Sequence, residues 1–298
     1  MTRCPLCSCD NAEILIRDGR DYEYGVSFQA DVARCGACGL VFQVPPPGWE
    51  DLPGYYPPEY ANYSVPTSLV ARLLLKGTDY LEARQVIKLL GRTGRILDVG
   101  CGSGYYFDVL SAYGDWTLEG TEISPESAAV AIAKGYPVFI GRLEDLDLPA
   151  EQYDLVRMNH LLEHVINPVT TLEKVHRLLR PGGYLLLETP NVSCPDFHLF
   201  RRYWGALHLP RHIHLFNPRN LRRLLDSSGF DLGRLQFTLM TTGWALSIQN
   251  WLKSWRDIKL VNGRMKSYPL LLLGFLPFLV VQKALGVSTM MRVWARKR

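Results

Sequence analysis

The most constraining feature of the sequence is a glycine-rich turn at residues 97–104 (LDVGCGSG). Four residues with the apolar pattern of a β-strand lead into it, and residues 105–110 (YYFDVL) have the pattern of a helix start. Such a turn places backbone N–H groups and a helix N-terminus against a bound group, and glycines let that group come close. The usual dinucleotide fingerprint is Gly-x-Gly-x-x-Gly, but here the third glycine comes one residue early, at Gly104. The turn therefore predicts a nucleotide-like ligand other than a dinucleotide.

The segments that follow alternate between strand and helix patterns, which predicts a parallel sheet with right-handed crossovers. Further strands are expected at residues 116–122, 138–141, 153–159, 183–189, 230–238 and 290–295, and helices at residues 68–90, 169–179 and 218–228 and from Pro125. In an open α/β sheet the ligand lies beyond the carboxyl ends of the strands, so Asp98, Gly100 and Glu122 should converge there. A carboxylate at the end of the second strand can accept hydrogen bonds from both ribose hydroxyls.

Residues 97–104, 153–156 (YDLV), 162–165 (LEHV) and 179–183 (LRPGG) resemble, in this order, the motifs of class I S-adenosylmethionine-dependent methyltransferases. The resemblance implies a Rossmann-like α/β fold, with a seven-stranded sheet whose last strand is antiparallel, and S-adenosylmethionine as the methyl donor. It implies a donor site formed by Asp98, Gly100, Cys101, Gly102, Gly104, Glu122, Ile123, Leu143, Glu144 and Asn159. Family members usually place an acidic residue near the position of Arg142 to contact adenine, so here the backbone near Leu143 and Glu144 is expected to make that contact.

Two Cys-x-x-Cys pairs, Cys4 with Cys7 and Cys35 with Cys38, lie near the start of the chain. Together they can present four thiolates to one ion, and a closed set of this kind predicts a structural zinc ion. Cys9 is an alternative ligand to Cys7, and reduced, unliganded cysteines are the other alternative. Strands are expected within this lobe at residues 13–16 and 26–30.

The expected organisation is a zinc-binding lobe at residues 1–48, a linker and helical lid at 49–94, and a methyltransferase domain at 95–298 with a helical insertion at 240–288. The tyrosines of residues 55–63 (YYPPEYANY) either line a site or pack against the fold.

Two histidine-containing segments are candidates for catalysis. His160, Glu163 and His164 follow the fourth strand and would share one face if the segment were helical. Related quinone O-methyltransferases carry Glu-x-x-Glu-His at this place, associated with a divalent cation, so a second cation is an alternative expectation. Residues 208–218 (HLPRHIHLFNP) resemble the His-x-x-x-Phe-Ser-Pro block of zinc-lobe methyltransferases that act on sugars, and His212 falls on the position of the histidine base. Because histidine titrates near neutrality, His212 and His164, with Glu163, are the expected catalytic residues, and a packing cluster is the alternative.

Charge is distributed unevenly along the chain. Residues 1–200 contain 16 Lys and Arg against 26 Asp and Glu, whereas residues 201–298 contain 17 against 3. This asymmetry predicts an anionic partner, and charge on solvated faces is the alternative. Residues 269–281 (PLLLLGFLPFLVV) are apolar but too short to span a bilayer. With the nearby basic residues and tryptophans, segment 251–285 predicts a contact with the inner face of a membrane or with a lipid-linked acceptor. A cap buried on the core or in a dimer is the alternative, and the oligomeric state stays open.

The resemblance implies methyl transfer, and a hydroxyl of a sugar, a glycolipid or a related lipid-linked acceptor is favoured, as in polysaccharide biosynthesis. C-methylation of a nucleotide deoxysugar is an alternative, although the sugar C-methyltransferases resembled here generally carry a further C-terminal domain. RNA methylation is disfavoured because the cysteine-rich lobe is not basic. A non-catalytic, membrane-associated binding module is the last alternative. The paired cysteines and the lack of a signal-peptide pattern at the start favour a cytoplasmic protein.

Overall fold

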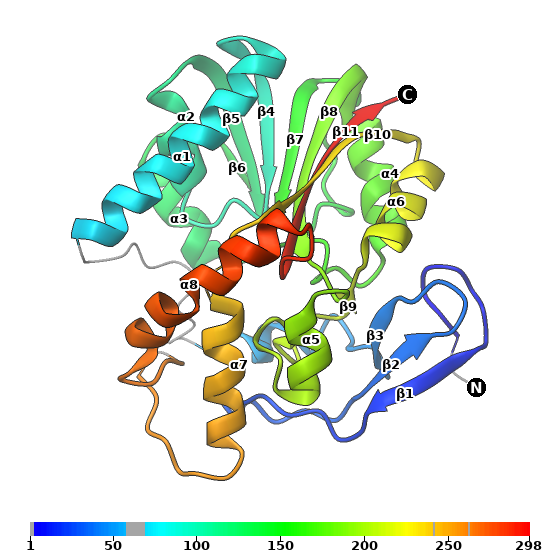
Figure 1. The fold of residues 1–298 in the computed structure, drawn as a ribbon. Helices are drawn as coiled ribbons and strands as arrows, with labels where there is room; N and C mark the ends of the chain where they lie inside the picture. Colours follow the sequence, from blue (N-terminus) through cyan, green and yellow to red (C-terminus); the bar gives the residue numbers. More distant parts are fainter. Residues whose placement is uncertain (1–2, 58–68, 241, 262) are drawn as a thin grey trace.

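The computed structural model describes residues 3–57 and 69–298, apart from residues 241 and 262 (Figure 1). Its main sheet has seven strands in the order β10-β11-β8-β7-β4-β5-β6. These strands are β4 (Thr93–Val99), β5 (Asp115–Glu122), β6 (Val138–Ile140), β7 (Tyr153–Asn159), β8 (Leu179–Pro190), β10 (Phe230–Thr238) and β11 (Met290–Lys297). β11 runs antiparallel to both β8 and β10, while the five strands β4 to β8 pair in parallel with one another. The α/β sheet with an antiparallel last strand is therefore confirmed.

Helices cover both faces of this sheet because alternate residues of each strand point to opposite sides. In β4, Ile96 packs with Ala83 and Phe107 of α1 and α2, whereas Leu97 packs with Leu172 and Leu221 of α4 and α6. The helices of the domain are α1 (Leu69–Leu90), α2 (Tyr105–Ser111), α3 (Pro125–Ala133), α4 (Pro168–Leu178), α5 (Pro195–Phe200) and α6 (Pro218–Ser227). Two apolar cores result, one on each face.

Helix starts follow their capping residues. The Ser124 hydroxyl accepts the backbone N–H of Ser127, and Pro125 occupies the first position of α3. Asn217 forms a capping box with Asn220 at the start of α6. The expected start of α1 at Ser68, like residues 58–63 of the tyrosine-rich segment, lies outside the described residues.

A second sheet forms in the N-terminal lobe, in the order β1-β2-β3-β9. Its strands are β1 (Ala12–Ile16), β2 (Asp31–Cys35), β3 (Val41–Val44) and β9 (His214–Leu215). The strand expected at residues 26–30 is wrong. Instead, the Asp21 carboxylate accepts backbone N–H groups of Glu23, Tyr24 and Val26, which holds this stretch as a loop. β9 belongs to the histidine-rich segment, so that segment completes the sheet of the lobe.

Two helices, α7 (Thr242–Lys253) and α8 (Tyr268–Ala284), separate β10 from β11, so the helical insertion is confirmed. They lie with the N-terminal lobe and α5 beyond the carboxyl ends of the parallel strands (Figure 1). In the described part of the chain, no helix combines the length and apolar character needed to cross a bilayer.

Candidate active site

The glycine-rich turn connects β4 to α2 at the carboxyl end of the sheet. Gly100, Gly102 and Gly104 have φ angles of 75°, 53° and 74°, a region that favours glycine. A Cβ atom at Gly104 would lie 2.9 Å from the Cβ of Ala131 in α3. Glycine at this position therefore permits both the turn and the close packing of α3 against it.

Glu122 ends β5 directly beside this turn. One carboxylate oxygen accepts the backbone N–H of Gly102 at 2.9 Å, and the other accepts that of Ser124 at 3.0 Å. Each oxygen keeps lone pairs for a further donor. Ile123, the next residue, is 56% exposed. A carboxylate beside an exposed apolar side chain offers hydrogen-bond acceptors for a ribose and a surface for a planar base.

Asp98 lies near the end of β4 and is buried. Its two oxygens accept hydrogen bonds from Arg157 Nη1 on β7, at 3.1 and 3.3 Å. Arg157 also pairs with Glu82 of α1 at 3.1 Å and lies over the ring of Tyr106. Burial raises the pKa of Asp98 despite this partner. The sequence interpretation missed Arg157, although a charged residue within an otherwise apolar strand pattern is a signal that could have identified it.

The remaining expected donor-site residues lie at neighbouring strand ends. Asn159 ends β7, Cys101 is buried within the turn, and Leu143 is buried after β6. The Glu144 carboxylate accepts the hydroxyl of Thr171 in α4. All ten residues thus gather at the carboxyl ends of β4 to β7, and their contacts with a methyl donor stay a prediction.

Arg142 departs from the family pattern and has partners of its own. Its guanidinium lies 3.7 Å from the centroid of the Trp49 ring and 2.9 Å from the Asp145 carboxylate. Arg142 therefore fastens the linker after the N-terminal lobe to the edge of the donor site.

The histidine cluster forms where the turn after β7 meets the segment before β9. The turn is not helical: His160 has a φ of 52°, and residues 162–164 form a turn. The helical face considered for His160, Glu163 and His164 is therefore not formed. Instead, Glu163, His164 and His212 each present a ligand atom, all within 4.8 Å of one another. The rings of His164 and His212 meet edge to face, with centroids 4.6 Å apart.

Hydrogen bonds fix the orientation of both rings. His212 Nδ1 lies 2.8 Å from the carbonyl oxygen of Ala206, and His164 Nδ1 lies 3.0 Å from that of Arg211. A carbonyl oxygen only accepts, so each Nδ1 carries the hydrogen and each Nε2 carries the lone pair when the ring is neutral. His212 Nε2 faces Glu163 Oε1 at 4.0 Å.

Glu163 is fully buried and only half satisfied. Its Oε2 accepts the hydroxyl of Thr189 at 2.9 Å, whereas its Oε1 has no hydrogen-bond partner among the described residues. Buried carboxylate oxygens normally have partners. Glu163 Oε1 and the Nε2 lone pairs of His164 and His212 therefore form a site that has hydrogen-bond acceptors but lacks a hydrogen-bond donor.

The pKa values of the cluster favour neutral imidazoles beside an ionised carboxylate. Burial lowers the pKa of His164 to about 4, against the opposing charge of Glu163. Burial, aided by the charges of His164 and His208, lowers the pKa of His212 well below its usual value. Burial alone would raise the pKa of Glu163, but His160, whose Nδ1 lies 3.5 Å from Oε1, and the charge of His164 lower it. Near neutral pH both imidazoles are therefore unprotonated, so each has a lone pair that can take a proton from a bound ligand.

Residues of the N-terminal lobe form ion pairs with the segment that carries His212. Arg211 is buried and pairs with Asp21 at 3.0 Å. Glu23 contacts His208 at 2.6 Å and Arg264 of the insertion at 2.8 Å. The pKa of Glu23 falls to about 2, because the charges of His208, Arg264 and Arg211 outweigh its burial.

Tyr56, at the end of the first described stretch, has its hydroxyl 3.1 Å from His164 Nδ1. The sequence interpretation missed Asp21, Glu23 and Arg211, and no local pattern marks them. It did note Tyr56 within the tyrosine-rich segment.

The four cysteines predicted to bind a metal are brought together. Their sulfur atoms lie within 4.8 Å of one another, with 3.6 Å between Cys4 and Cys38 and 3.5 Å between Cys7 and Cys35. A tetrahedral zinc ion with Zn–S bonds of about 2.3 Å places its sulfurs about 3.8 Å apart. The cluster, which does not include Cys9, therefore fits such an ion.

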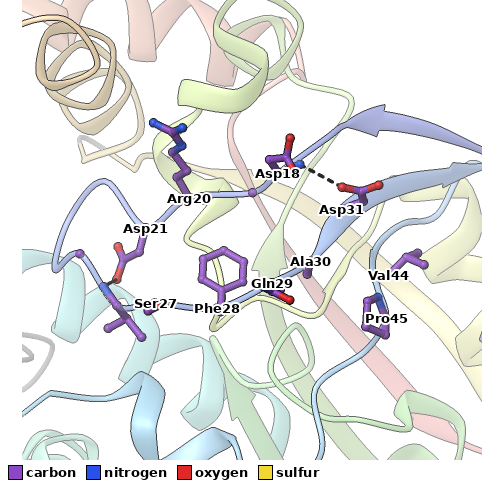
Figure 2. Close-up of a pocket in the computed structure, with 13 residues that line it drawn as sticks. Asp18, Arg20, Asp21, Ser27, Phe28, Gln29, Ala30, Asp31, Val44 and Pro45 are labelled. Atoms are coloured by element: carbon purple, nitrogen blue, oxygen red, sulfur yellow. Dashed lines mark hydrogen bonds between the residues drawn. The ribbon is translucent and has the colours of Figure 1, made fainter.

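An open pocket of about 760 Å³ lies in the same lobe, between residues 18–31 and β3 (Figure 2). A hydrogen bond from the Asp18 N–H to Asp31 Oδ1 crosses one end. Arg20 and Gln29 are exposed in its lining, and Phe28 lies edge-on to Tyr55. Asp21, which lies in the pocket lining, pairs with Arg211, the residue before His212.

Residues 68–235 match the family model described as a methyltransferase domain. The ubiquinone biosynthesis O-methyltransferase of Paracidovorax citrulli is 30% identical over 51% of this chain and 71% of its own length. The protein of the same name from Xanthomonas oryzae pv. oryzae is 36% identical over 41% of this chain, and that match spans about half of the relative's own length (52%).

Solved structures share the fold. An S-adenosylmethionine-dependent methyltransferase from Mesorhizobium loti superposes with a TM-score of 0.51 at 20% identity, covering 74% of this chain and 97% of that one. A methyltransferase of the same kind from Archaeoglobus fulgidus gives 0.51 at 18% identity, covering 76% and 94%. The family match leaves out the cysteine-rich lobe and the insertion with α7 and α8.

Proposed function

The chain belongs to the S-adenosylmethionine-dependent methyltransferases, and from this premise we propose that it methylates a hydroxyl of a small acceptor held against Glu163, His164 and His212. One observation carries the proposal: Glu163 Oε1 is buried without a hydrogen-bond donor among the described residues, 4.0 Å from His212 Nε2. An acceptor hydroxyl is a donor of the kind that this site lacks.

His212 is the proposed base. Bound S-adenosylmethionine supplies an activated methyl group. His212 Nε2 takes the hydroxyl proton, while its Nδ1–H stays hydrogen-bonded to the Ala206 carbonyl oxygen and keeps the ring in place. The ionised Glu163 stabilises the resulting imidazolium. The O–H and S–CH3 bonds break, the O–CH3 bond forms, and the proton leaves through His212.

The proposed donor site consists of the ten residues at the carboxyl ends of β4 to β7. Glu122 would accept the ribose hydroxyls and Ile123 would contact the base, since both lie directly after the strand that flanks the turn. Asp98, fixed by Arg157, would face the amino acid end of the donor.

A sugar or glycolipid hydroxyl is the proposed acceptor, with O-methylation favoured over C-methylation. The pocket of the N-terminal lobe, linked to the cluster through the Asp21–Arg211 pair, supports a hydroxylated acceptor, because Arg20, Gln29 and Asp18 offer donors and acceptors beside the aromatic ring of Phe28. A phenolic hydroxyl is the second candidate, since the similar proteins of P. citrulli and X. oryzae are named as ubiquinone biosynthesis O-methyltransferases.

The test measures S-adenosylhomocysteine release by the purified protein with nucleotide sugars, glycolipids, catechol-type quinone precursors and RNA. Release with a sugar class and an O-methyl signal in the product supports the proposal. Release with catechols alone selects the second candidate. In a sugar-active enzyme, Gln29→Ala should raise KM several-fold with kcat unchanged, whereas Glu13→Ala, exposed in β1 outside the pocket, should change neither. No release with any hydroxyl acceptor would overturn the proposal.

Zinc at Cys4, Cys7, Cys35 and Cys38 is proposed to be structural, because four thiolates leave no open position. The Glu163, His164 and His212 atoms could also hold a second divalent cation, which would polarise the acceptor oxygen. Elemental analysis separates the two sites: one zinc per chain, lost in Cys35→Ser and retained in Glu163→Gln, is expected. If a second metal is found and is lost in Glu163→Gln, removal of the hydroxyl proton would be assisted by a metal ion and would not depend on His212 alone.

A further inference from the structure

The outer face of α8 is apolar and exposed. Within the described residues, its large apolar side chains with 41–71% exposure are Leu270, Leu273, Leu276, Phe278, Val280 and Val281, and Leu285 follows the helix. We name this set the α8 patch. The opposite face packs on α7: Trp244 stacks on Phe275 at 5.3 Å, and Leu279 and Gln282 are buried. One face of α8 therefore packs on α7, and the other face is exposed and available to a partner.

The surroundings of the patch are strongly basic. Residues 239–288 contain six Lys and Arg, at positions 253, 256, 259, 264, 266 and 283, and a single acidic residue, Asp257. Arg264 pairs with Glu23. Lys259, Lys266 and Lys283 are exposed and make no ion pair with any residue that the structure describes. Lys266 precedes α8 and Lys283 lies near its end, so positive charge flanks the patch at both ends.

Two tryptophans lie beside the basic residues. Trp251 and Trp255 are 44% and 54% exposed, and their rings meet edge to face with centroids 5.5 Å apart. Val261, in the loop between the two helices, is 74% exposed. Tryptophan favours the level of lipid headgroups, where its ring is apolar and its N–H is wet. Exposed apolar, basic and indole groups thus occur together on one segment.

We propose that the α8 patch and the loop between α7 and α8 dock on the surface of an anionic lipid bilayer. An apolar stripe flanked by unpaired lysines suits such a surface, since acyl chains take up the leucines and anionic headgroups attract the lysines. α8 has 17 residues including Pro277, and no described helix is able to span a bilayer, so the contact is peripheral. A second copy of the chain is a poorer fit, because pairing two patches would bring lysines of like charge together.

Docking would involve elements that also support the histidine cluster. The insertion supports that cluster directly: the Ser247 hydroxyl of α7 accepts the Gly205 N–H, and Gly205 precedes Ala206, whose carbonyl oxygen holds His212. Gln282 of α8 donates to Asp196 at 3.1 Å, and Asp196 also accepts from Trp204 at 2.7 Å. A membrane contact at α8 would therefore act on elements that support the acceptor side. Lipid binding itself does not depend on the proposed methyl transfer.

The experiment is co-sedimentation of the full chain with vesicles of phosphatidylcholine, with and without phosphatidylglycerol. Binding is expected with phosphatidylglycerol, weak without it, and reduced by 0.5 M salt. Leu270→Glu with Leu273→Glu should lower the partition coefficient at least tenfold. Removing Lys259, Lys266 and Lys283 by Gln substitution should lower it by about fivefold per lysine. Val130→Glu, on an exposed apolar position of α3 (47% exposed), is the matched control and should bind as the parent does.

Circular dichroism and S-adenosylmethionine binding show whether each variant is folded, so that lost lipid binding is not mistaken for unfolding. The proposal is overturned if the folded parent does not bind anionic vesicles. It is also overturned if sedimentation equilibrium finds a dimer that Leu270→Glu with Leu273→Glu converts to a monomer, since the patch would then be covered by a second chain.

Discussion

The donor side and the acceptor side of the active site are built in different ways. The turn, Glu122 and Ile123 come from one strand-turn-helix-strand unit, and neighbouring parallel strands bring Asp98, Arg157 and Asn159 to the same edge. The acceptor side collects Asp21 and Glu23, Tyr56, Glu163 and His164, the segment 208–214, and Arg264 from separate parts of the chain. Donor binding thus rests on a local unit of the fold, whereas acceptor chemistry rests on long-range packing.

Their electrostatics differ as well. Asp98 is buried with a cation in contact, so its charge is compensated within the protein. The histidine cluster leaves the buried Glu163 Oε1 without a hydrogen-bond partner among the described residues. On the donor side the protein itself supplies the partner of the buried Asp98 carboxylate. On the acceptor side the buried Glu163 oxygen gains a hydrogen-bond donor only when a ligand binds.

The largest expected effect separates the two sides through His212→Ala. Loss of the base should lower kcat by about 10²–10⁴-fold, while the affinity for S-adenosylmethionine stays within about twofold, because His212 lies outside the strand-end unit that binds the donor. Single-turnover kinetics and calorimetry measure the two quantities. His198→Ala, an exposed histidine of α5, is the control and should leave kcat unchanged. An unchanged kcat in His212→Ala would remove His212 from the chemistry.

Long-range assembly of the acceptor side is tested by Arg211→Met. Asp21 would lose its buried partner at 3.0 Å, which should lower the free energy of unfolding by about 3–5 kcal/mol. Urea unfolding measures this change. Adding Asp21→Asn should recover part of the loss, because the uncompensated charge is removed with its partner. Equal stability of the single and double variants would mean that the pair does not hold the lobe against the cluster.

Glu122→Gln tests the donor side and should have a smaller effect. The amide keeps the shape of the carboxylate but weakens charge-assisted hydrogen bonds worth about 1.5–3 kcal/mol, so S-adenosylmethionine should bind roughly 10–150-fold more weakly. Calorimetry measures the affinity, and kcat at saturating donor should change little. Glu126→Gln, an exposed neighbour in α3, is the matched control. If both variants bind equally well, Glu122 does not contact the donor.

The sequence predicted the donor side far better than the acceptor side. Strand and helix patterns, the cap at Ser124 and the glycine turn all act over a few residues, and the expected strands from β4 to β11 are confirmed. The error at residues 26–30 arose because the Asp21 carboxylate binds backbone N–H groups up to five residues ahead, which an apolar pattern does not show.

His164 and His212 were identified from short motifs, but their supports were not. Glu23 contacts His208, which is 185 residues away in the chain, and Arg157 joins strand β7 to helix α1. Sequence reasoning also treated the lobe and the catalytic domain as separate, whereas β9 of one completes the sheet of the other. Contacts of this kind follow from the packed fold and have no local signature.

The smallest expected effect is a near-constant rate across neutral pH. An unperturbed imidazole would change its neutral fraction about fourfold between pH 6 and 8. Burial lowers the pKa of His164 to about 4 and that of His212 well below its usual value, so both rings stay neutral over this range. With an acceptor that does not itself titrate, kcat/KM should vary by less than about 1.5-fold. Besides burial, the charges of His208 and His160 lower the pKa of His164, whereas Glu163 and the backbone of Arg211 raise it. Tyr56 and His212 also contact the His164 ring.

Over the same pH range the free energy of unfolding should change, although the rate should not. Below the ordinary pKa of histidine, the unfolded chain binds a proton at His164 that the folded chain does not bind until pH approaches about 4. The free energy of unfolding is therefore highest, as far as His164 is concerned, above pH 7, and it decreases as the pH falls through 6 and 5. Urea midpoints at pH 7.5 and 5.5 measure it. A rate that instead drops with a midpoint near pH 6.5 would mean that the catalytic histidine is solvated, and that the acceptor side is open before its ligand arrives.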